Sequence, residues 1–151
     1  MHKVADQVQA AVGIPLLHLS DATAQAVTRA GLRTVGLLGT AFTMEQDFYR
    51  DRLTSHGLRV LSRHPRTEPR CTASSTTSCA WVWSERTPGS RRTYRDAIVR
   101  LVQAGAEGVV LGCTEIELLI SDTDSPVPVF PTTRLHVEAA VDALLATRAS
   151  V

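Results

Sequence analysis

The sequence is poor in aromatic residues and has too few cysteines for a framework of disulfide bonds. Phe, Trp and Tyr make up 5% of the 151 residues, and the three cysteines, Cys71, Cys79 and Cys113, include no Cys-x-x-Cys pair. An odd, widely spaced set of thiols indicates neither a set of disulfides nor a zinc site. We therefore expect no metal ion in this protein.

The sequence also lacks a long apolar run and an excess of charge of one sign. No apolar stretch approaches the ~18 residues of a membrane span, and residues 1–17 lack a basic start followed by a continuous apolar block. Lys and Arg total 16 against 15 Asp and Glu, which gives a formal net charge of +1. We expect a cytoplasmic protein that binds a small molecule, with no nucleic acid or membrane as partner.

Hydrophobic residues are plentiful, at 44% of the chain. This content and length suffice for one core and are too small for two full-sized domains. We expect a single domain over residues 1–147.

Short apolar runs bounded by Gly, Pro or polar residues alternate with segments of helical pattern. The runs are predicted to be strands buried on both faces. They cover residues 14–19, 34–39, 58–61, 107–111 and 127–130.

The predicted helices cover residues 22–30, 44–56, 94–102 and 137–145. The last two have apolar residues at i, i+3, i+4, i+7 and i+8, so each is expected to turn one face to the core. Ser20 and Asp21 are candidate caps for the first helix, and Gly31 and Gly57 follow the first and second as end signals.

Alternating strands and helices predict an α/β fold, a doubly wound parallel sheet with helices on both faces. Ligands bind such sheets at the carboxyl ends of the strands. The expected binding edge therefore consists of the turns after Leu19, Leu38 and Leu111.

Residues 63–92 break this pattern. They hold both tryptophans, two of the three cysteines and a Ser/Thr cluster, with no period of 3.6 or 2. We expect an irregular segment, although structureless loops of this length are uncommon inside compact domains.

Cys113 is the leading candidate for a reactive group. It follows the strand of residues 107–111 and Gly112, and it precedes Thr114, where a helix can start. A helix N-terminus favours thiolate over thiol, and a thiolate is both a nucleophile and a base. The structural alternative is an inert buried cysteine.

Three neighbouring polar residues are candidates for contacts with a substrate. Thr40, at the end of the strand of residues 34–39, either binds a carboxylate or caps a helix. Glu115 is either a general acid/base beside the thiol or an acid that complements the helix dipole, and Thr114 is expected at the same site. The sequence lacks the fingerprints of nucleotide-binding loops, so no nucleotide is proposed.

Other polar residues have weaker claims. His18, Asp21 and Thr23 either line a pocket or cap a helix. Thr132 and Thr133 are expected to be helix caps, and His136 a surface or packing residue.

Several motifs in a fixed order resemble the aspartate/glutamate racemase family, over residues 1–62 and 93–147. They are Ile-Pro-Leu-Leu-His (14–18), Val-Gly-Leu-Leu-Gly-Thr (35–40), Phe-Thr-Met-Glu (42–45), Phe-Tyr (48–49), Leu-Gly-Cys-Thr-Glu-Ile (111–116) and Thr-Thr-Arg-Leu-His (132–136).

The resemblance implies a flavodoxin-like fold and an amino-acid racemase that works without pyridoxal phosphate or any other cofactor. Such enzymes use two cysteines on opposite faces of the substrate, one as base and one as acid. Cys113 matches the second of these cysteines, and Thr40 matches a threonine that contacts the substrate carboxylate. Aspartate or glutamate is the implied substrate.

The first family cysteine has no counterpart here, because its motif would stand immediately before Met1. We expect an N-terminally truncated member that is weak or inactive by itself. If the codons of residues 69–84 are read one nucleotide earlier, suitable synonymous choices give a run resembling the family. We therefore interpret residues 63 to about 91 as a frame-shifted replacement of a helix pair, in which Cys71 and Cys79 have no inherited role.

Two other functions stay open. A related decarboxylase or isomerase could use one thiol, although the Thr-Met-Glu and Leu-His motifs favour the racemases. A noncatalytic binding module or degenerate racemase fragment is the alternative from a different class. Loss of the N-terminal strands would expose apolar faces, so self-association into a homo-oligomer is also expected.

Overall fold

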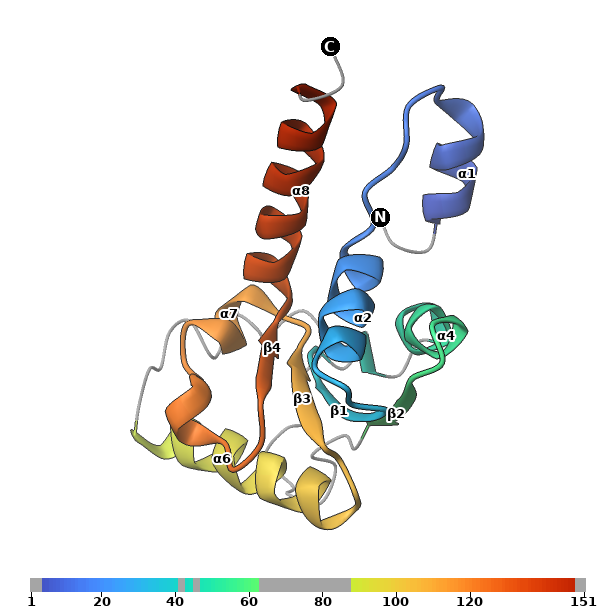
Figure 1. Ribbon diagram of the computed structural model, residues 1–151. Helices are drawn as coiled ribbons and strands as arrows, with labels where there is room; N and C mark the ends of the chain where they lie inside the picture. The colour runs from blue at the N-terminus through green and yellow to red at the C-terminus, as the bar shows by residue number, and fades with distance from the viewer. Residues whose placement is uncertain (1–3, 41–42, 45–46, 63–87, 149–151) are drawn as a thin grey trace.

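Four parallel strands form one sheet in a computed structural model that describes residues 4–40, 43–44, 47–62 and 88–148 (Figure 1). The spatial order is β2-β1-β3-β4, with parallel pairing between all neighbours. This confirms the predicted parallel sheet. The strands are β1 (Thr34–Leu38), β2 (Arg59–Ser62), β3 (Gly108–Leu111) and β4 (Val129–Pro131).

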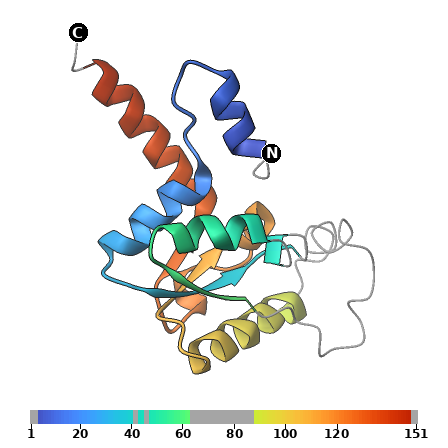
Figure 2. The same ribbon diagram turned by 90° about the vertical axis from the view of Figure 1, so that its right-hand side faces the viewer.

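Helices cover both faces of the sheet, as expected for a doubly wound α/β fold. On one face lie α2 (Leu19–Arg29), α4 (Asp47–Ser55) and the start of α8 (Thr132–Arg148). On the other lie α6 (Pro88–Gln103) and the short α7 (Thr114–Glu117) (Figure 2). The remaining elements are α1 (Ala5–Ala11) and a 3₁₀ turn, Asp122–Asp124.

Side chains of the two central strands alternate between two cores. Val35 and Leu37 pack with α2 and α4, whereas Leu38 of β1 and Val109 and Leu111 of β3 pack with α6 and α7. All five are at most 3% exposed. Each such side chain stabilises the fold by about 1.5–3 kcal/mol relative to leaving it in water. The central strands are therefore the most deeply buried part of the molecule.

The predicted glycine signals at the helix ends are confirmed. Gly31 after α2 and Gly57 after α4 have φ angles of +77° and +81°. A residue without Cβ enters this left-handed region at no steric cost. Each glycine therefore ends its helix and lets the chain turn toward the next strand.

The strand predicted for residues 14–19 is wrong. Ile14 is 72% exposed, and α2 already begins at Leu19. The Gln9 side chain donates to the Ile14 carbonyl (3.1 Å) and accepts from the Leu16 N–H (2.6 Å), so backbone groups here are paired without a neighbouring strand. Leu19 is consequently the first residue of a helix and not the end of a strand.

Two further expectations need correction. In α8, Val137, Val141, Leu144 and Leu145 are 47–70% exposed, so this apolar stripe does not face a core in the described part of the chain. The irregular segment predicted to reach residue 92 is already helical from Pro88. Its remainder, residues 63–87 with Cys71 and Cys79, lies outside the described residues.

Within the described residues, no helix combines the length and apolar character that a membrane crossing requires.

Candidate functional site

The strand order reverses direction between β1 and β3. From β1 the chain crosses through α4 to β2 on one side, and it then returns through α6 to β3 on the other side of β1. Connections leave in opposite directions at such a switch point, and open α/β sheets bind their ligands there, outside the carboxyl ends of the strands. Two of the three predicted turns, those after Leu38 and Leu111, meet at this place.

The two turns are locked to one another. Leu38 pairs with Leu111, and the N–H of Gly112 donates to the Leu38 carbonyl at 2.7 Å. A Cβ on Gly112 would lie 3.3 Å from both Leu37 Cδ1 and the Leu38 oxygen. A side chain at this position would push its neighbours by a few tenths of an ångström, so glycine suits this close approach. Because Leu38 pairs with Leu111, Thr40 and Cys113 each follow a paired leucine by two residues.

Cys113 is the N-cap residue of α7, as its sequence context predicted, and its side chain is half-buried. Its carbonyl accepts from the N–H groups of Ile116 (3.1 Å) and Glu117 (3.2 Å), but its thiol makes no capping bond. Because α7 has four residues, few peptide dipoles add up at its start. The charge nearest to the thiol comes from a side chain instead.

Glu115 supplies that charge. The Cys113 thiol donates to Glu115 Oε2 at 2.7 Å, and the Thr114 hydroxyl donates to the same oxygen at 3.0 Å. The thiol hydrogen bond is the main reason why the pKa of the Glu115 carboxyl lies below its usual value. The ionised carboxylate is therefore placed to hold a proton on sulfur. Three predicted site residues therefore form one hydrogen-bonded group, in which Cys113 and Thr114 both donate to Glu115 Oε2.

Thr40 makes the capping contacts that were one of its two expected roles. Its Oγ1 accepts from the Thr43 N–H at 3.1 Å and lies 3.0 Å from Thr43 Oγ1. Its carbonyl accepts from the Met44 N–H at 3.0 Å. Either hydroxyl can be the donor in the contact between Thr40 and Thr43, and the Thr40 proton is left for another acceptor only when Thr43 donates.

Glu117 was not identified from the sequence. Its Oε1 accepts from the Thr133 N–H (2.8 Å) and the Thr133 hydroxyl (3.0 Å), and Thr132 Oγ1 lies at 3.2 Å. The same Thr132 hydroxyl lies 2.8 Å from the carbonyl oxygen of Leu111. Glu117 therefore links α7 to the start of α8 and to the end of β3. The Thr132-Thr133 pair could be recognised in the sequence as a possible helix start, but its acceptor, Glu117, lies in another element.

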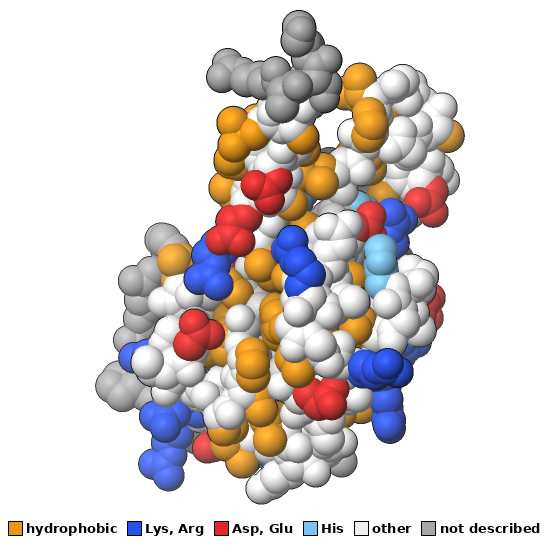
Figure 3. Space-filling view, viewed as in Figure 1, with side chains coloured by type: hydrophobic (Ala, Val, Ile, Leu, Met, Phe, Trp, Pro, Cys, Tyr) orange, Lys and Arg blue, Asp and Glu red, His pale blue; other side chains and the backbone are white. Residues whose placement is uncertain are grey.

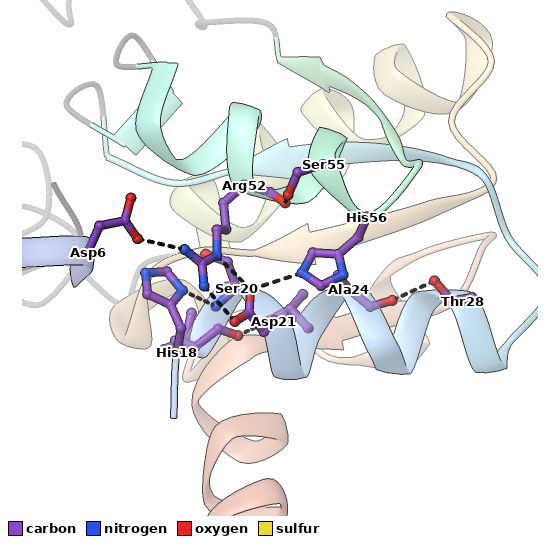
Figure 4. A network of polar contacts seen from close by, with 11 residues as sticks. Asp6, His18, Ser20, Asp21, Ala24, Thr28, Arg52, Ser55 and His56 are labelled. Atoms are coloured by element: carbon purple, nitrogen blue, oxygen red, sulfur yellow. Dashed lines mark hydrogen bonds and ion pairs between the residues drawn. The ribbon is translucent and has the colours of Figure 1, made fainter. Parts of the chain in front are cut away.

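His18 and Asp21 have structural roles within and around α2 (Figure 4), and Thr23 bonds within the same helix. His18 is the N-cap and accepts from the Ser20 N–H at 3.2 Å, so Ser20 is inside the helix and not its cap. The Thr23 hydroxyl donates to the Leu19 carbonyl at 2.9 Å. Asp21 binds Arg52 of α4 through both carboxylate oxygens, at 2.7 and 2.8 Å.

The Asp21 network joins three helices. Arg52 also donates to Asp6 of α1 at 3.2 Å, and His56 Nε2 lies 2.9 Å from Asp21 Oδ1. The Arg52 hydrogen bond is the main reason why the pKa of Asp21 falls to about 2. These contacts give Asp21 a role in holding α1, α2 and α4 together.

The remaining predicted positions are at the start of α8. Thr132 and Thr133 were expected to be helix caps, but they are the first residues inside α8, and the Glu117 carboxylate makes the capping contact with the Thr133 N–H. His136 is half-buried, with its Nδ1 buried and without a hydrogen-bond partner. No group of three His, Cys, Asp or Glu side chains in the described part of the chain is arranged to hold a metal ion.

The fold and the site together define a doubly wound α/β protein with a thiol and a carboxylate at its switch point. The chain belongs to the Asp/Glu/hydantoin racemase family, whose model matches residues 1–140. This confirms the family resemblance of the sequence motifs.

Two solved structures share the fold. A candidate Asp/Glu racemase from Yersinia pestis is 42% identical, with a TM-score of 0.82, over 96% of this chain and 63% of its own. An aspartate racemase homologue from Pyrococcus horikoshii OT3 is 33% identical, with a TM-score of 0.75, over 94% of this chain and 62% of its own. The present chain thus spans less than two thirds of either protein.

A more distant relative is an uncharacterized protein from the pnlA 3′ region of Pectobacterium carotovorum subsp. carotovorum. It is 28% identical over 109 residues, which are 70% of this chain and 67% of that protein.

Proposed function

We propose that this chain is an amino-acid racemase of the aspartate/glutamate type that transfers the α-proton through Cys113 without a cofactor. The observation that carries the proposal is the Cys113–Glu115 hydrogen bond, 2.7 Å long, at the switch point of a racemase-family fold. A thiol held against a carboxylate is an acid/base group with a partner for its proton. A purely structural cysteine has no need of such a partner.

The proposed proton transfer is reversible. As acid, the Cys113 thiol delivers its proton to the planar α-carbanion, and the S–H electron pair stays on sulfur as thiolate. As base, the thiolate takes the α-proton, and the C–H electron pair stays on the substrate as an enolate-like carbanion. The neighbouring Glu115 charge disfavours thiolate and thereby raises its basicity, which suits removal of a weakly acidic proton.

Thr40 and Thr114 are the proposed substrate contacts. The carbanion places negative charge on the substrate carboxylate, so fixed donors at this carboxylate stabilise the transition state. The Thr40 hydroxyl can donate to a substrate carboxylate when Thr43 is the donor in the contact between the two hydroxyls. The hydrogen bond from the Gly112 N–H to the Leu38 carbonyl keeps the turns of Thr40 and Cys113 in register. Glu115 is proposed to act on the thiol and to line the same site.

Inversion of configuration needs a second acid/base group on the opposite face of the α-carbon. Incubation of the chain with L- and D-aspartate or glutamate in D₂O therefore has two readouts. Proton NMR measures α-deuteration, which the Cys113 thiol can perform from one face. Chiral chromatography measures inversion, which requires the complete pair.

We expect α-deuteration of at least one enantiomer of aspartate or glutamate. Deuteration with retained configuration would indicate one working thiol, and deuteration with inversion a complete racemase. Substrate binding without deuteration of either enantiomer would contradict the proposal and indicate a noncatalytic binding module.

A further inference from the structure

Helix α7, which follows Cys113, is too short to fix its own orientation. It consists of the four residues Thr114–Glu117, and Cys113 is its N-cap residue. Forming a single hydrogen-bonded turn is costly, so such a helix is marginal without tertiary contacts. The direction of the Cys113 thiol therefore depends on the elements that hold α7 in place.

Apolar packing holds one side of α7. Ile116 is 1% exposed and Ile120, which follows the helix, is 2% exposed, and both belong to the core formed with α6. This packing keeps α7 against the sheet, but the hydrophobic effect has no preferred direction. A directional contact is needed to fix how α7 is turned.

Glu117 makes such a contact at the end of α7 opposite to Cys113. Its Oε1 lies 2.8 Å from the Thr133 nitrogen, 3.0 Å from Thr133 Oγ1 and 3.2 Å from Thr132 Oγ1. Hydrogen bonds weaken steeply when their geometry departs from the optimum. Because three donors converge on one oxygen atom, a rotation of α7 would weaken several of these bonds at once.

The donors to Glu117 are at the base of α8, where this helix is attached to the sheet. Helix α8 begins directly after β4, Thr132 is 3% exposed, and Leu135 packs on the core formed with α2 and α4. Farther along, α8 projects beyond the sheet in both ribbon views, and Figure 3 shows apolar side chains along the projecting part. Glu117 therefore binds the part of α8 whose position the sheet fixes.

Thr132 connects both ends of the segment that contains Cys113. Its Oγ1 lies 2.8 Å from the Leu111 carbonyl oxygen and 3.2 Å from Glu117 Oε1. Leu111 is the last residue of β3 before the turn of Cys113, and Glu117 is the last residue of α7 after it. One buried hydroxyl is thus within hydrogen-bond distance of both ends of residues 111–117.

We propose that Glu117 and Thr132 are positioning residues for proton transfer by Cys113. They act through the backbone of residues 111–117, which they hold so that the thiol stays beside Glu115 Oε2 at the switch point. For its effect on catalysis the inference rests on the proposed function. Its effect on the thiol itself can be measured without a substrate.

The pH profile of Cys113 alkylation, followed at the peptide level, tests the positioning directly. Glu115 disfavours thiolate only while the sulfur stays beside it, so a released α7 should let the thiol ionise more readily. We expect Glu117→Ala and Thr132→Val to shift the profile down by roughly half a pH unit. Thr132→Val removes no charge, so its shift cannot come from a lost carboxylate.

Two further variants separate positioning from charge and from a general loss of stability. Glu117→Gln keeps an acceptor oxygen for the Thr133 donors and should have the parent profile. Thr23→Val is the matched control for Thr132→Val, because Thr23 is also buried and its hydroxyl donates to the Leu19 carbonyl in α2. Thr23→Val should leave the profile unchanged.

A double variant tests whether the effect passes through Glu115. When Glu115→Gln has removed the carboxylate beside the thiol, the position of α7 should no longer matter for ionisation. Adding Thr132→Val to Glu115→Gln should therefore cause no further shift, which is the signature of two coupled positions. Shifts that add in full would overturn the inference.

The kinetics of α-deuteration of aspartate or glutamate in D₂O test the effect on catalysis. A displaced base impairs the transition state, so Glu117→Ala should lower kcat by about 10-fold with KM unchanged, and Glu117→Gln should restore it. Parent profiles in Glu117→Ala and Thr132→Val, or equal effects of Glu117→Ala and Glu117→Gln, would overturn the inference. If the profiles shift as expected but the parent chain deuterates neither enantiomer, the proposed function fails while the positioning of the thiol stands.

Discussion

Cys113 is distinguished from an ordinary buried cysteine by its neighbours. The thiol is half-buried and donates a hydrogen bond to Glu115 Oε2 at 2.7 Å, and the Thr114 hydroxyl donates to the same oxygen. The sequence context correctly predicted the strand end and the helix start at this residue. It did not predict how the thiol would be tuned, because a one-turn helix provides little dipole and the nearby carboxylate dominates.

The first prediction concerns the charge beside the thiol. Glu115→Gln removes a negative charge next to sulfur, so thiolate should form more readily. The pH profile of Cys113 alkylation, followed at the peptide level, should shift down by about one pH unit.

Glu107→Gln is the matched control for this charge. Glu107 is another carboxylate with a lowered pKa, but it accepts from the N–H groups of Arg33 and Thr34 at the opposite edge of the sheet. An unchanged alkylation profile in Glu115→Gln, or the same shift in both variants, would disprove the pairing of thiol and carboxylate.

The second prediction concerns Glu117. Glu117→Ala removes the acceptor for the Thr133 amide and hydroxyl, so it should lower the free energy of unfolding by about 1–3 kcal/mol. Urea denaturation measures this loss. Glu138→Ala is the control, since that side chain is 60% exposed and its ion pair with Arg134 is 3.6 Å long. An equally small loss of unfolding free energy in both variants would contradict the role assigned to Glu117.

At the scale of elements, helix α4 is held to α2 by a charge pair as well as by its apolar face. The pKa of Asp21 is lowered to about 2, mainly by Arg52. A carboxyl whose folded pKa is depressed stabilises the protein above its unfolded value of about 4, and this contribution is lost as the pH falls toward 2.

The third prediction follows from this dependence. Asp21→Asn should cost about 1 kcal/mol at pH 7, after allowance for solvent screening, and nearly nothing at pH 2. Urea midpoints at the two pH values measure the difference. Asp51→Asn on α4 is the control for removing a carboxylate, because the Asp51 side chain is 69% exposed and its partner Arg50 lies 3.9 Å away. A constant cost of Asp21→Asn at both pH values would contradict the assignment.

The fourth prediction concerns the contact between β1 and α6. A Cβ on Gly36 would lie 2.8 Å from Leu101 Cδ1 and 3.1 Å from Leu101 Cβ, so Gly36→Ala should destabilise the fold by about 1–3 kcal/mol. Gly13→Ala, where a Cβ meets nothing within 4 Å, should be nearly neutral. Thermal unfolding compares the two, and equal midpoints would show that α6 does not pack this closely on β1.

The sequence was most informative where several signals agreed. The four strands that formed combine apolar runs with flanking glycines or prolines, and Gly31 and Gly57 correctly marked helix ends. The run at residues 14–19 had the same composition, but in the described part of the chain no strand pairs with it and no element covers the apolar stripe of α8. The periodicity of apolar residues predicts which face of an element should be buried. It does not predict which other element buries that face, because this depends on the tertiary structure.

At the scale of the whole molecule, the site comes from topology. Thr40 and Cys113 are far apart in sequence, and the reversal of strand order next to β1 brings their turns together. The sequence predicted this edge because parallel strands bind ligands at their carboxyl ends. The Glu117 link to α8 could not be predicted, because it depends on how α7 and α8 meet in space.

A fifth prediction tests the interpretation that residues 63 to about 91 are a frame-shifted replacement. It concerns the codons of residues 69–84. The coding sequence, read one nucleotide earlier, should encode a run similar to Ala-Val-His-Arg-Ile-Ile-Tyr-Asp-Glu-Leu, with the Trp81-Val82 codons yielding a glycine preceded by Leu, Val or Met. Sequencing the gene decides this directly. A shifted frame without such a run would end the interpretation.

The central claim is that Cys113 transfers the α-proton of the substrate. The most direct measurement is the rate of α-deuteration of aspartate or glutamate in D₂O for the parent chain, for Cys113→Ala and for Cys79→Ala as a control for loss of a thiol. We predict a loss of at least about 100-fold for Cys113→Ala and an unchanged rate for Cys79→Ala. Deuteration that survives Cys113→Ala would contradict the account.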